Sequence, residues 1–220
     1  MIPWKMIISK YVKHLINGVI AGILISLAAF FSIIATNEGS EIISVIISSF
    51  GFLFVALYGY DFYTGKIGNA LENKAEYLLE LLIALIGNFI GAWVVALLSK
   101  VTSYDVSLFV LAKAEEMTQG SWALEALIKS LIAGIVIYFV FNTYKKAEQP
   151  IARFSSLLLG AIVIYFLGFN EIVSELFYCN LGALNGCSYG SLMSKIIFVF
   201  TGNTLGALFI PLLRKLKSIL

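Results

Sequence analysis

Six long runs of apolar residues, each without a charged side chain, dominate the pattern of the chain. They are residues 15–37, 42–60, 81–99, 130–144, 154–170 and 196–213. A bilayer core about 30 Å thick needs about 20 helical residues, and about 17 can suffice. The fourth run is short, but it reaches this length if its helix begins near Trp122 and holds Glu125 and Lys129 at the membrane interface. The pattern therefore predicts an all-α protein with six transmembrane helices.

Polar residues and glycines interrupt the second and fifth predicted helices. The first interruption is residues 59–65, GYDFYTG, and the second is residues 168–177, GFNEIVSELF. Lipid cannot satisfy polar groups at this depth, so such stretches persist only where protein or a water-filled cavity satisfies them. Paired interruptions at corresponding places in two halves of a chain indicate a transport site. We therefore expect helices two and five to be broken around a pore.

The two halves of the chain also resemble each other. Residues 19–23 match 131–135, residues 59–61 match 168–170, and residues 87–92 match 202–207. The offsets are 112, 109 and 115 residues, so the three matches follow in the same order at nearly one spacing. This predicts a single domain, residues 1–220, built from two repeats of approximately 1–110 and 111–220. Three helices per repeat place the copies in opposite orientations, so the repeat is predicted to be inverted.

The composition is that of a membrane protein. Apolar residues make up 60% of the chain and charged residues 13%, whereas soluble domains have about 25% charged residues. The first apolar run begins near Leu15 without a small-residue cleavage site, which favours a retained helix over a signal peptide. The net charge of +2, with no long basic run, argues against a nucleic-acid partner. The lipid bilayer is therefore the expected environment.

The distribution of Lys and Arg predicts the orientation in the membrane. Eleven of the 15 lie near the two termini, between helices two and three, or between helices four and five. Loops rich in Lys and Arg stay in the cytoplasm. We therefore expect a multi-pass protein of a bacterial-type inner membrane with both termini cytoplasmic, as an even number of helices requires.

Glu171 and Glu175 are the candidate titratable residues of the pore. They lie one helical turn apart and share a face if a half-helix begins near Glu171. Burial and a neighbouring carboxylate both disfavour the charged form, so at least one of the pair can be protonated at neutral pH. Glu171 can also cap the half-helix, where free backbone N–H groups and the helix dipole attract negative charge, and the two roles are compatible. Glu175 is expected to be structural or to line a vestibule.

Other residues near the interruptions are candidates for supporting roles. Asp61 is expected to bind backbone N–H groups of its loop, and Thr64 to offer a hydroxyl to a solute. Asn88 and Asn203 lie inside helices three and six, where their amides can satisfy the free backbone of the interruptions. The remaining candidates either narrow the pore, pack between helices or shape the breaks: Phe62, Tyr63, Ile164, Phe169, Asn170, Gly59 and Gly168.

The sequence carries no pattern typical of an enzyme or a metal protein. It has no Walker motif and no nucleophile–base set, so we expect no catalytic site, cofactor or metal. His14 is the only histidine, which excludes a multi-histidine site, and it is expected to be an interfacial side chain. Cys179 and Cys187 fall between the last two predicted helices, where a disulfide and two free thiols are both possible. Three charged residues near helix ends are expected to extend to the interface: Glu80, Lys129 and Lys195.

The order of these motifs resembles the formate/nitrite transporter family over nearly the whole chain. Residues 18–26 are similar to the family's A-G-x-x-I-S/G opening, and residues 61–66 to its D-L-F-T loop. Residues 87–92 and 202–206 resemble its G-N-x-x-G elements in helices three and six. The Gly-Phe-Asn-Glu of residues 168–171 falls where the family has G-F-E-H. The order and spacing of the motifs together carry the resemblance.

This resemblance implies an aquaporin-like fold and a homopentamer with one pore per protomer. It also implies passage of small monovalent anions or their conjugate acids, such as formate, nitrite and hydrosulfide. By position, the family's central histidine corresponds to Glu171, and the asparagine later in that motif to Glu175. Phe62 and Thr64 take the places of the loop leucine and threonine, and Ile164 that of a pore phenylalanine.

The departures from the family pattern concern the charge of the pore. The family asparagine of helix four corresponds to Gly134, and the vestibular lysine falls near Thr118, with Lys113 as a loose substitute. The carboxyl group of Glu171 can be neutral or negative but never positive. If ionised, it repels an anion a few ångströms away by several kcal/mol at an effective dielectric constant near 20. If protonated, it can donate a proton or a hydrogen bond to formate or hydrosulfide.

The sequence leaves three functions open. The first is a pentameric channel, with or without coupling to protons, for small monovalent solutes of the formate type, with Glu171 as the central titratable group and Thr64 and Asn203 supplying hydrogen bonds. The second is a channel for ammonium, ammonia or another neutral or cationic solute, because Glu171 replaces the histidine. The third is a non-conducting structural or sensory membrane protein. Uptake of formate, uptake of ammonium and the absence of flux distinguish the three.

Overall fold

The computed structural model of the chain describes residues 4–219, and the regular structure within this range is helical throughout. In chain order the helices are α1 (Trp4–Asn37), α2 (Glu41–Tyr58), α3 (Tyr63–Ile67), the 3-10 helix η1 (Ala70–Glu72), α4 (Glu76–Ser99), α5 (Ser107–Glu116), α6 (Trp122–Lys146), α7 (Pro150–Phe166), α8 (Ile172–Leu184) and α9 (Tyr189–Lys217). The all-α class predicted from the apolar runs is confirmed.

The helices differ in apolar length. α1 over Ile8–Asn37, α2, α4, α6 and α9 are each long and apolar enough to cross a membrane. α7 and α8 are apolar but shorter. α6 begins at Trp122, as predicted for the helix of the fourth apolar run. Five of the six predicted spans therefore correspond to helices of sufficient length. The count of six stays a prediction, because the fifth apolar run corresponds to α7.

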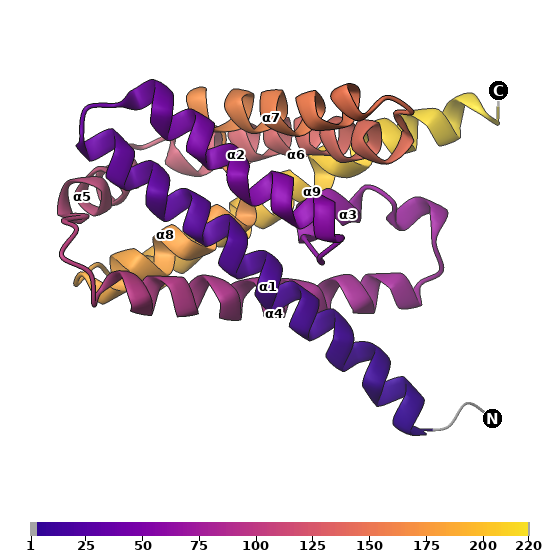
Figure 1. Cartoon of the computed structure of the whole chain (residues 1–220), viewed down its shortest axis with the longest axis horizontal. Helices are drawn as coiled ribbons and strands as arrows, with labels where there is room; N and C mark the ends of the chain where they lie inside the picture. The colour runs from indigo at the N-terminus through magenta and orange to yellow at the C-terminus, as the bar shows by residue number, and fades with distance from the viewer. Residues whose placement is uncertain (1–3, 220) are drawn as a thin grey trace.

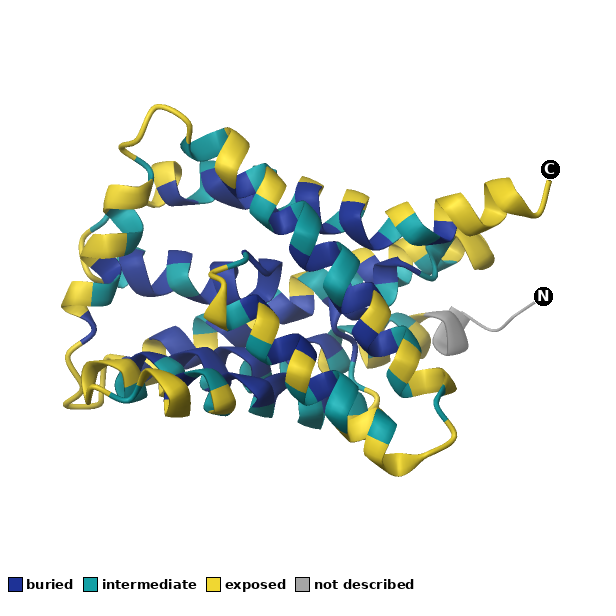
Figure 2. Ribbon diagram, turned by 90° about the horizontal axis from the view of Figure 1, so that it is seen from above, coloured by how far each residue is buried: buried dark blue, intermediate teal, exposed yellow. Residues whose placement is uncertain are grey.

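The long helices pack in two sets that meet around α8. α1 packs along α2 and α4, and α6 packs along α7 and α9. α2 also contacts α7, while α8 contacts both α4 and α9. Figure 1 shows α1 crossing the bundle obliquely and α5 lying at the end opposite to the one where α1 begins and α9 ends. Figure 2 shows buried residues along the inward faces of the helices and exposed residues on their outer faces.

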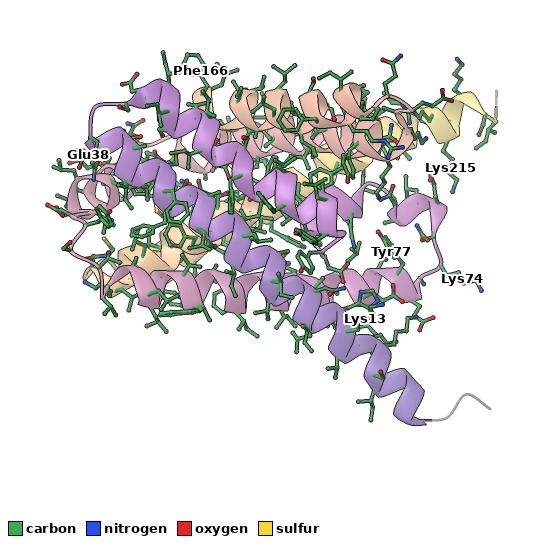
Figure 3. The ribbon with its side chains drawn as sticks, in the orientation of Figure 1. Lys13, Glu38, Lys74, Tyr77, Phe166 and Lys215 are labelled. Atoms are coloured by element: carbon green, nitrogen blue, oxygen red, sulfur yellow. The ribbon has the colours of Figure 1, made fainter. Side chains whose placement is uncertain are left out.

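The two ends of the bundle carry different connections. Lys74, between α3 and α4, and Lys215, near the end of α9, lie at the end where α1 begins (Figure 3). Glu38, after α1, and Phe166, the last residue of α7, lie toward the opposite end (Figure 3). The basic connection before α4 and the basic end of α9 therefore share one side of the molecule, as the Lys and Arg distribution predicts.

Glycines allow the backbones of paired helices to approach closely. A Cβ atom added at Gly91 of α4 would collide with the carbonyl oxygen of Val19 in α1. The same contact recurs between α6 and α9, where a Cβ atom at Gly206 would collide with the carbonyl oxygen of Leu131. Small residues at helix interfaces let transmembrane helices associate by close van der Waals packing. The α1–α4 and α6–α9 pairs thus have little room for larger side chains at these points.

Replacing Gly91 by Ala is expected to lower the stability of the folded protein. The added methyl group meets backbone atoms of α1, which cannot rotate away as a side chain can, so the two helices must separate. Overpacking of this kind costs about 1–3 kcal/mol. Thermal unfolding of the purified protein in detergent should give a lower midpoint for Gly91→Ala than for the wild type.

Gly120→Ala is the matched control, because a Cβ atom at this position meets no heavy atom within 4 Å. Its unfolding midpoint should equal that of the wild type within error. An unchanged midpoint for Gly91→Ala would contradict the close approach of α1 and α4.

Candidate functional site

The second interruption presents Glu171 at the N-terminus of α8. α7 ends at Phe166, and Gly168 turns the chain with a positive φ of 65°. Oε1 of Glu171 then accepts the N–H of Val173 and Oε2 accepts the N–H of Ser174, each at 2.9 Å. The first N–H groups of a helix have no partner within the helix, and a capping side chain satisfies them. The capping role predicted for Glu171 is confirmed.

The first interruption brings Thr64 to the same carboxyl group. Gly59 ends α2 with a positive φ of 69°, and the short helix α3 begins at Tyr63. Thr64 lies in α3 and is fully buried. Its hydroxyl donates a hydrogen bond to Oε1 of Glu171 at 3.1 Å and also lies 3.5 Å from Oδ1 of Asn203. Two stretches that are 107 residues apart therefore meet at one carboxyl group.

Asn88 of α4 supports the first interruption. Its Oδ1 accepts the N–H of Tyr63 at 3.2 Å. Its Nδ2 donates to the carbonyl oxygens of Asp61 and Gly18, each at 2.8 Å. The side chain is fully buried, so these three backbone groups gain partners that lipid cannot offer. The structural role predicted for Asn88 is confirmed.

Asn203 of α9 supports the second interruption in the same manner. Its Oδ1 accepts the N–H of Ile172 at 2.8 Å. Its Nδ2 donates to the carbonyl oxygens of Asn170 at 2.9 Å and Ser130 at 2.8 Å. The backbone hydrogen bonds predicted for this second asparagine are therefore present, and they place Asn203 within reach of Thr64.

A cavity of about 210 Å³, which we call the carboxylate cavity, is lined by both Glu171 and Glu175. The hydroxyl of Tyr165, another lining residue, lies 2.7 Å from Oγ of Ser174, and Ser174 in turn donates to Oε2 of Glu171 at 3.1 Å. The rest of the lining consists mainly of hydroxyl and aromatic side chains, with one lysine: Ser32, Thr36, Ser44, Phe109, Lys113, Phe169, Asn170 and Tyr178. The sequence interpretation missed Tyr165 and Ser174. Only Ser174 carried a signal, since it follows the capping residue by three positions.

The apolar candidates for a constriction lie in different surroundings. Phe62 is fully buried, and its ring centroid lies 5.4 Å from those of Phe52 and Phe141. Ile164 is also fully buried. Tyr63 turns toward α9, where both its hydroxyl and its ring find partners. Phe62 therefore belongs to an aromatic cluster beside Thr64, whereas Tyr63 packs away from it.

Asp61 does not bind the backbone N–H groups of its loop, within the part of the chain that the structure describes. Its buried carboxylate forms an ion pair with Lys66, and its Oδ2 lies 2.8 Å from Nδ1 of His14. Charged donors make stronger hydrogen bonds to a carboxylate than neutral backbone groups do. The partners predicted for Asp61 were therefore wrong, although the residue does lie inside the interruption.

His14 was expected only to lie at the membrane interface, and it has a more specific place. Besides its contact with Asp61, its Nε2 lies 3.6 Å from Oε2 of Glu80, which also pairs with Lys10 at 2.5 Å. His14, Asp61, Lys66, Tyr77, Glu80 and Lys145 all line a cavity of about 320 Å³, which we call the histidine cavity. The available signal was the position of His14 one turn before Gly18, whose carbonyl oxygen binds Asn88.

Lys195 does not extend to the interface, contrary to the expectation from its place near a helix end. Its side chain is only 8% exposed, and Nζ lies 3.0 Å from Oε2 of Glu175 and 3.0 Å from Oε2 of Glu116. Glu116 pairs further with Lys113 at 2.8 Å. Burial acts to raise the pKa of the Glu116 carboxyl, but Lys113 and Lys195 outweigh it and hold this pKa below its ordinary value. Two carboxylates thus keep the Lys195 ammonium inside the protein, because a buried charge persists where it is paired.

A further cavity of about 160 Å³, the lysine cavity, is lined by Lys113, Lys129 and Lys195. Gly168 and Asn170 line both this cavity and the carboxylate cavity. Of its charged residues, Lys129 pairs with Glu125 at 2.6 Å and stays partly exposed, as predicted.

The two cysteines are both free thiols. Cys179 lies buried within α8, and not between the last two helices as expected, because α8 extends to Leu184. Cys187 follows α8 in the connection to α9. Over residues 4–219, no group of three or more His, Cys, Asp or Glu side chains is arranged to hold a metal ion. Most of the charged residues around the three cavities form ion pairs, as Asp61 does with Lys66, Glu175 with Lys195 and Glu125 with Lys129.

Comparison with known proteins shows that the sequence and the fold of this chain are similar to those of transport proteins. A family model described as "Formate/nitrite transporter" matches residues 5–215. A solved structure described as "Pentameric formate channel with formate bound" is similar at a TM-score of 0.75 and 17% identity, with 96% of this chain and 98% of that one covered. Another, described as "FNT family ion channel", has a TM-score of 0.71 and 17% identity, with 91% and 86% covered. At this identity the two structures show a shared fold. No curated protein matches the chain.

Replacing Asn203 by Ala is expected to destabilise the protein strongly. The change removes three hydrogen bonds from buried backbone groups, and each group left without a partner costs about 1–3 kcal/mol. Asn88→Ala, which removes the equivalent bonds, should lower the thermal unfolding midpoint by a similar amount.

Asn73→Ala serves as the control, because Asn73 is exposed and its side-chain amide donates to the carbonyl oxygen of Asn69 at the protein surface. This variant should unfold close to the wild-type midpoint. If Asn203→Ala and Asn73→Ala unfold at the same temperature, Asn203 does not support the second interruption.

Proposed function

The chain belongs to the formate/nitrite transporter family, and on this basis we propose that it is a channel for small monovalent solutes of the formate, nitrite or hydrosulfide type. We assign this multi-pass membrane protein a transport role and no catalytic one. The observation that carries the proposal is the hydrogen bond from Thr64 to Glu171. It joins both interruptions at one buried carboxyl group that also lines a cavity.

The proposed path runs between two cavities toward opposite ends of the bundle. The carboxylate cavity is lined by residues at the end of α1 and the start of α2, and the histidine cavity by residues near the start of α4 and the end of α6. Glu171, Thr64 and Asn203 supply the polar groups along this path. Phe62 and Ile164 supply its apolar part, where a charged solute without its water would be costly.

Glu171 is proposed to transfer a proton to the anion before the apolar part is crossed. An ionised Glu171 would repel a monovalent anion 4 Å away by about 4 kcal/mol at an effective dielectric constant of 20. A protonated Glu171 removes this repulsion and can convert formate or hydrosulfide into its neutral acid. The ionised carboxylate left behind is then held by the donors of Val173, Ser174 and Thr64.

The Thr64 hydroxyl is suited to both charge states of Glu171. It carries one hydrogen but lies near two acceptors, Oε1 of Glu171 at 3.1 Å and Oδ1 of Asn203 at 3.5 Å. When Glu171 is ionised, Thr64 donates to it. When Glu171 is protonated, Thr64 can accept from it and donate to Asn203. Glu171 can therefore gain or lose its proton while the Thr64 hydroxyl keeps a hydrogen-bond partner.

A channel for ammonium or ammonia is the second candidate function. It is favoured by the lining of the carboxylate cavity, which combines Glu171 and Glu175 with several hydroxyl groups that can accept hydrogen bonds from an ammonium ion. Aromatic faces in the same lining, such as that of Tyr178, also attract cations. This candidate differs from the first in the sign of the charge that the cavity favours.

The architecture proposed for the channel is one domain, residues 1–220, of two inverted repeats with helices broken at the interruptions. It is supported by the bonds of Asn88 and Asn203, because each amide bonds the corresponding atoms of its own half. The partners of Asn203 follow those of Asn88 by 109 residues within the interruptions (Tyr63 to Ile172, Asp61 to Asn170) and by 112 residues for Gly18 and Ser130. These are the offsets at which the sequence itself repeats.

The assembly proposed for the chain is a homopentamer with a pore in each protomer. It is supported by the similarity to a structure described as a pentameric formate channel. The proposed location is a bacterial-type inner membrane, with both termini in the cytoplasm. The shared side of Lys74 and Lys215 supports that orientation (Figure 3).

Formate uptake into proteoliposomes tests the role of Glu171. Wild-type flux should rise as the pH falls, because more of the carboxyl groups then carry the proton to be donated. Glu171→Gln cannot donate a proton, so its flux should be at least about tenfold lower at acidic pH and independent of pH, as expected for a barrier that is higher by more than about 1.4 kcal/mol. Glu171→His can again supply a proton and should restore much of the flux.

Glu38→Gln is the control for this series, because Glu38 is an exposed carboxylate at the same end of the bundle as the carboxylate cavity. Its flux should match the wild type at every pH. Uptake of ammonium without formate by the wild type would favour the second candidate, and the absence of flux for formate, hydrosulfide and ammonium would favour a non-conducting protein.

The pentamer is tested by native mass spectrometry of the detergent-solubilised protein. The expected mass is five times the chain mass of 24.2 kDa, with detergent and lipid removed. A dominant monomer or dimer under conditions that keep the protein folded would contradict the proposed assembly.

A further inference from the structure

Glu175 adds a second carboxylate to the place where Glu171 is proposed to act. Glu171 caps α8 and Glu175 lies one turn further along, where its N–H donates to the carbonyl oxygen of Glu171 at 2.9 Å. Both are buried, with 1% of Glu171 and 5% of Glu175 exposed, and both line the carboxylate cavity. Two negative charges this close in a buried site repel each other strongly unless one is neutralised.

Lys195 of α9 supplies the neutralising charge. Its Nζ lies 3.0 Å from Oε2 of Glu175, and the two side chains are 8% and 6% exposed. The pair stands between two cavities, since Glu175 lines the carboxylate cavity and Lys195 lines the lysine cavity. Lys195 also lies 3.0 Å from Glu116, but the Glu116 side chain is 46% exposed and has Lys113 as a second partner. Glu175 is therefore the partner whose charge water screens least.

We propose that Lys195 determines the charge selectivity of this channel by cancelling the charge of Glu175. A solute in the carboxylate cavity then meets Glu171 as the one carboxylate whose charge is not balanced by an adjacent ammonium. This inference rests on the proposed channel function and adds a residue to it. Lys195 acts through Glu175, so it is a positioning residue that sets the electrostatics of the path.

The effect of losing Lys195 follows from the charges that remain. Without the ammonium, Glu175 and Glu171 face the carboxylate cavity as two acidic groups one turn apart. The cavity then attracts cations and repels anions more strongly, since the potential at a site is the sum of the charges around it. Lys113 cannot take over, because its ammonium is held 2.8 Å from Glu116 and 5.7 Å from the ring centroid of Tyr178.

Removing Glu175 together with Lys195 should cancel the effect. In the double variant Glu175→Gln/Lys195→Met, neither charge is present, so the cavity again contains Glu171 as its one unbalanced carboxylate. Coupled residues show such non-additive effects in a double-mutant cycle, whereas a general loss of packing does not reverse when a second residue is changed.

The experiment compares formate and methylammonium uptake in proteoliposomes that contain the full-length protein. The measured quantity is the ratio of the two fluxes, which does not depend on how much protein is incorporated. Lys195→Met should lower the formate to methylammonium ratio about tenfold or more, the scale expected for one uncompensated charge within a helical turn. Lys195→Arg keeps the positive charge and should keep the ratio close to the wild type. Glu175→Gln alone should raise the ratio, because Lys195 then adds a positive charge beside the cavity.

Lys129→Met is the matched control. It removes the same charge from the same lysine cavity, but Lys129 pairs with Glu125 and both side chains are more than a third exposed. Its flux ratio should equal that of the wild type. The unfolding midpoint and the elution volume of each variant report whether it is folded.

Several outcomes would overturn the inference. One is a folded Lys195→Met whose ratio equals the wild type, and another is a loss of both fluxes in equal proportion, which indicates a structural role only. If Lys195→Met does not fold, the other two variants still test the inference. It is overturned if the formate to methylammonium ratio does not rise in Glu175→Gln, or if the ratio of the double variant differs from that of the wild type. If the wild type passes neither solute, the proposed function and this inference are overturned together. If the wild type conducts and Lys195→Met has the same flux ratio, this inference alone is overturned.

Discussion

The need to satisfy backbone polar groups inside an apolar bundle determines most of this structure. At two places the helical hydrogen bonding stops, and each N–H or C=O left free there would cost several kcal/mol in lipid. Asn88, Asn203 and Glu171 satisfy these groups from fully or almost fully buried positions. Because the two asparagines stand on α4 and α9, their helices must lie close to α1 and α6. The glycines at positions 91 and 206 permit that approach.

The same requirement accounts for the chemistry of the proposed pore. Glu171 is needed to cap α8, and its position as a cap also points its carboxyl group toward Thr64 and the carboxylate cavity. A residue that stabilises the break is thus also the group that a solute would meet on the proposed path. The charges around it are balanced in pairs, with Lys195 beside Glu175 and Lys66 beside Asp61. Such pairs matter because removing one partner would leave the other as an uncompensated buried charge.

The sequence indicated which residues meet in the candidate site better than it indicated their hydrogen-bond and ion-pair partners. The apolar runs and their interruptions pointed to Glu171, Thr64, Asn88 and Asn203, because glycine and polar residues at membrane depth have few alternative explanations. Asp61 was recognised as part of the break, but its binding to His14 and Lys66 was not. Nothing in the local pattern relates a histidine early in α1 to an aspartate 47 positions later, since only the crossing of α1 over the α2–α3 connection brings them together.

What the sequence by itself determined was the class of protein, the positions of the interruptions and the internal matches that predict a repeat, because these depend on local composition and on comparison of the chain with itself. Only the tertiary structure decided which side chains meet across the bundle. Lys195 shows the difference most clearly: near the start of a helix, a lysine is expected to reach water, and its burial depends on Glu175 and Glu116 arriving from α8 and α5. The energy of a charge inside a protein is determined by its neighbours in space, and those neighbours are set by how the helices pack.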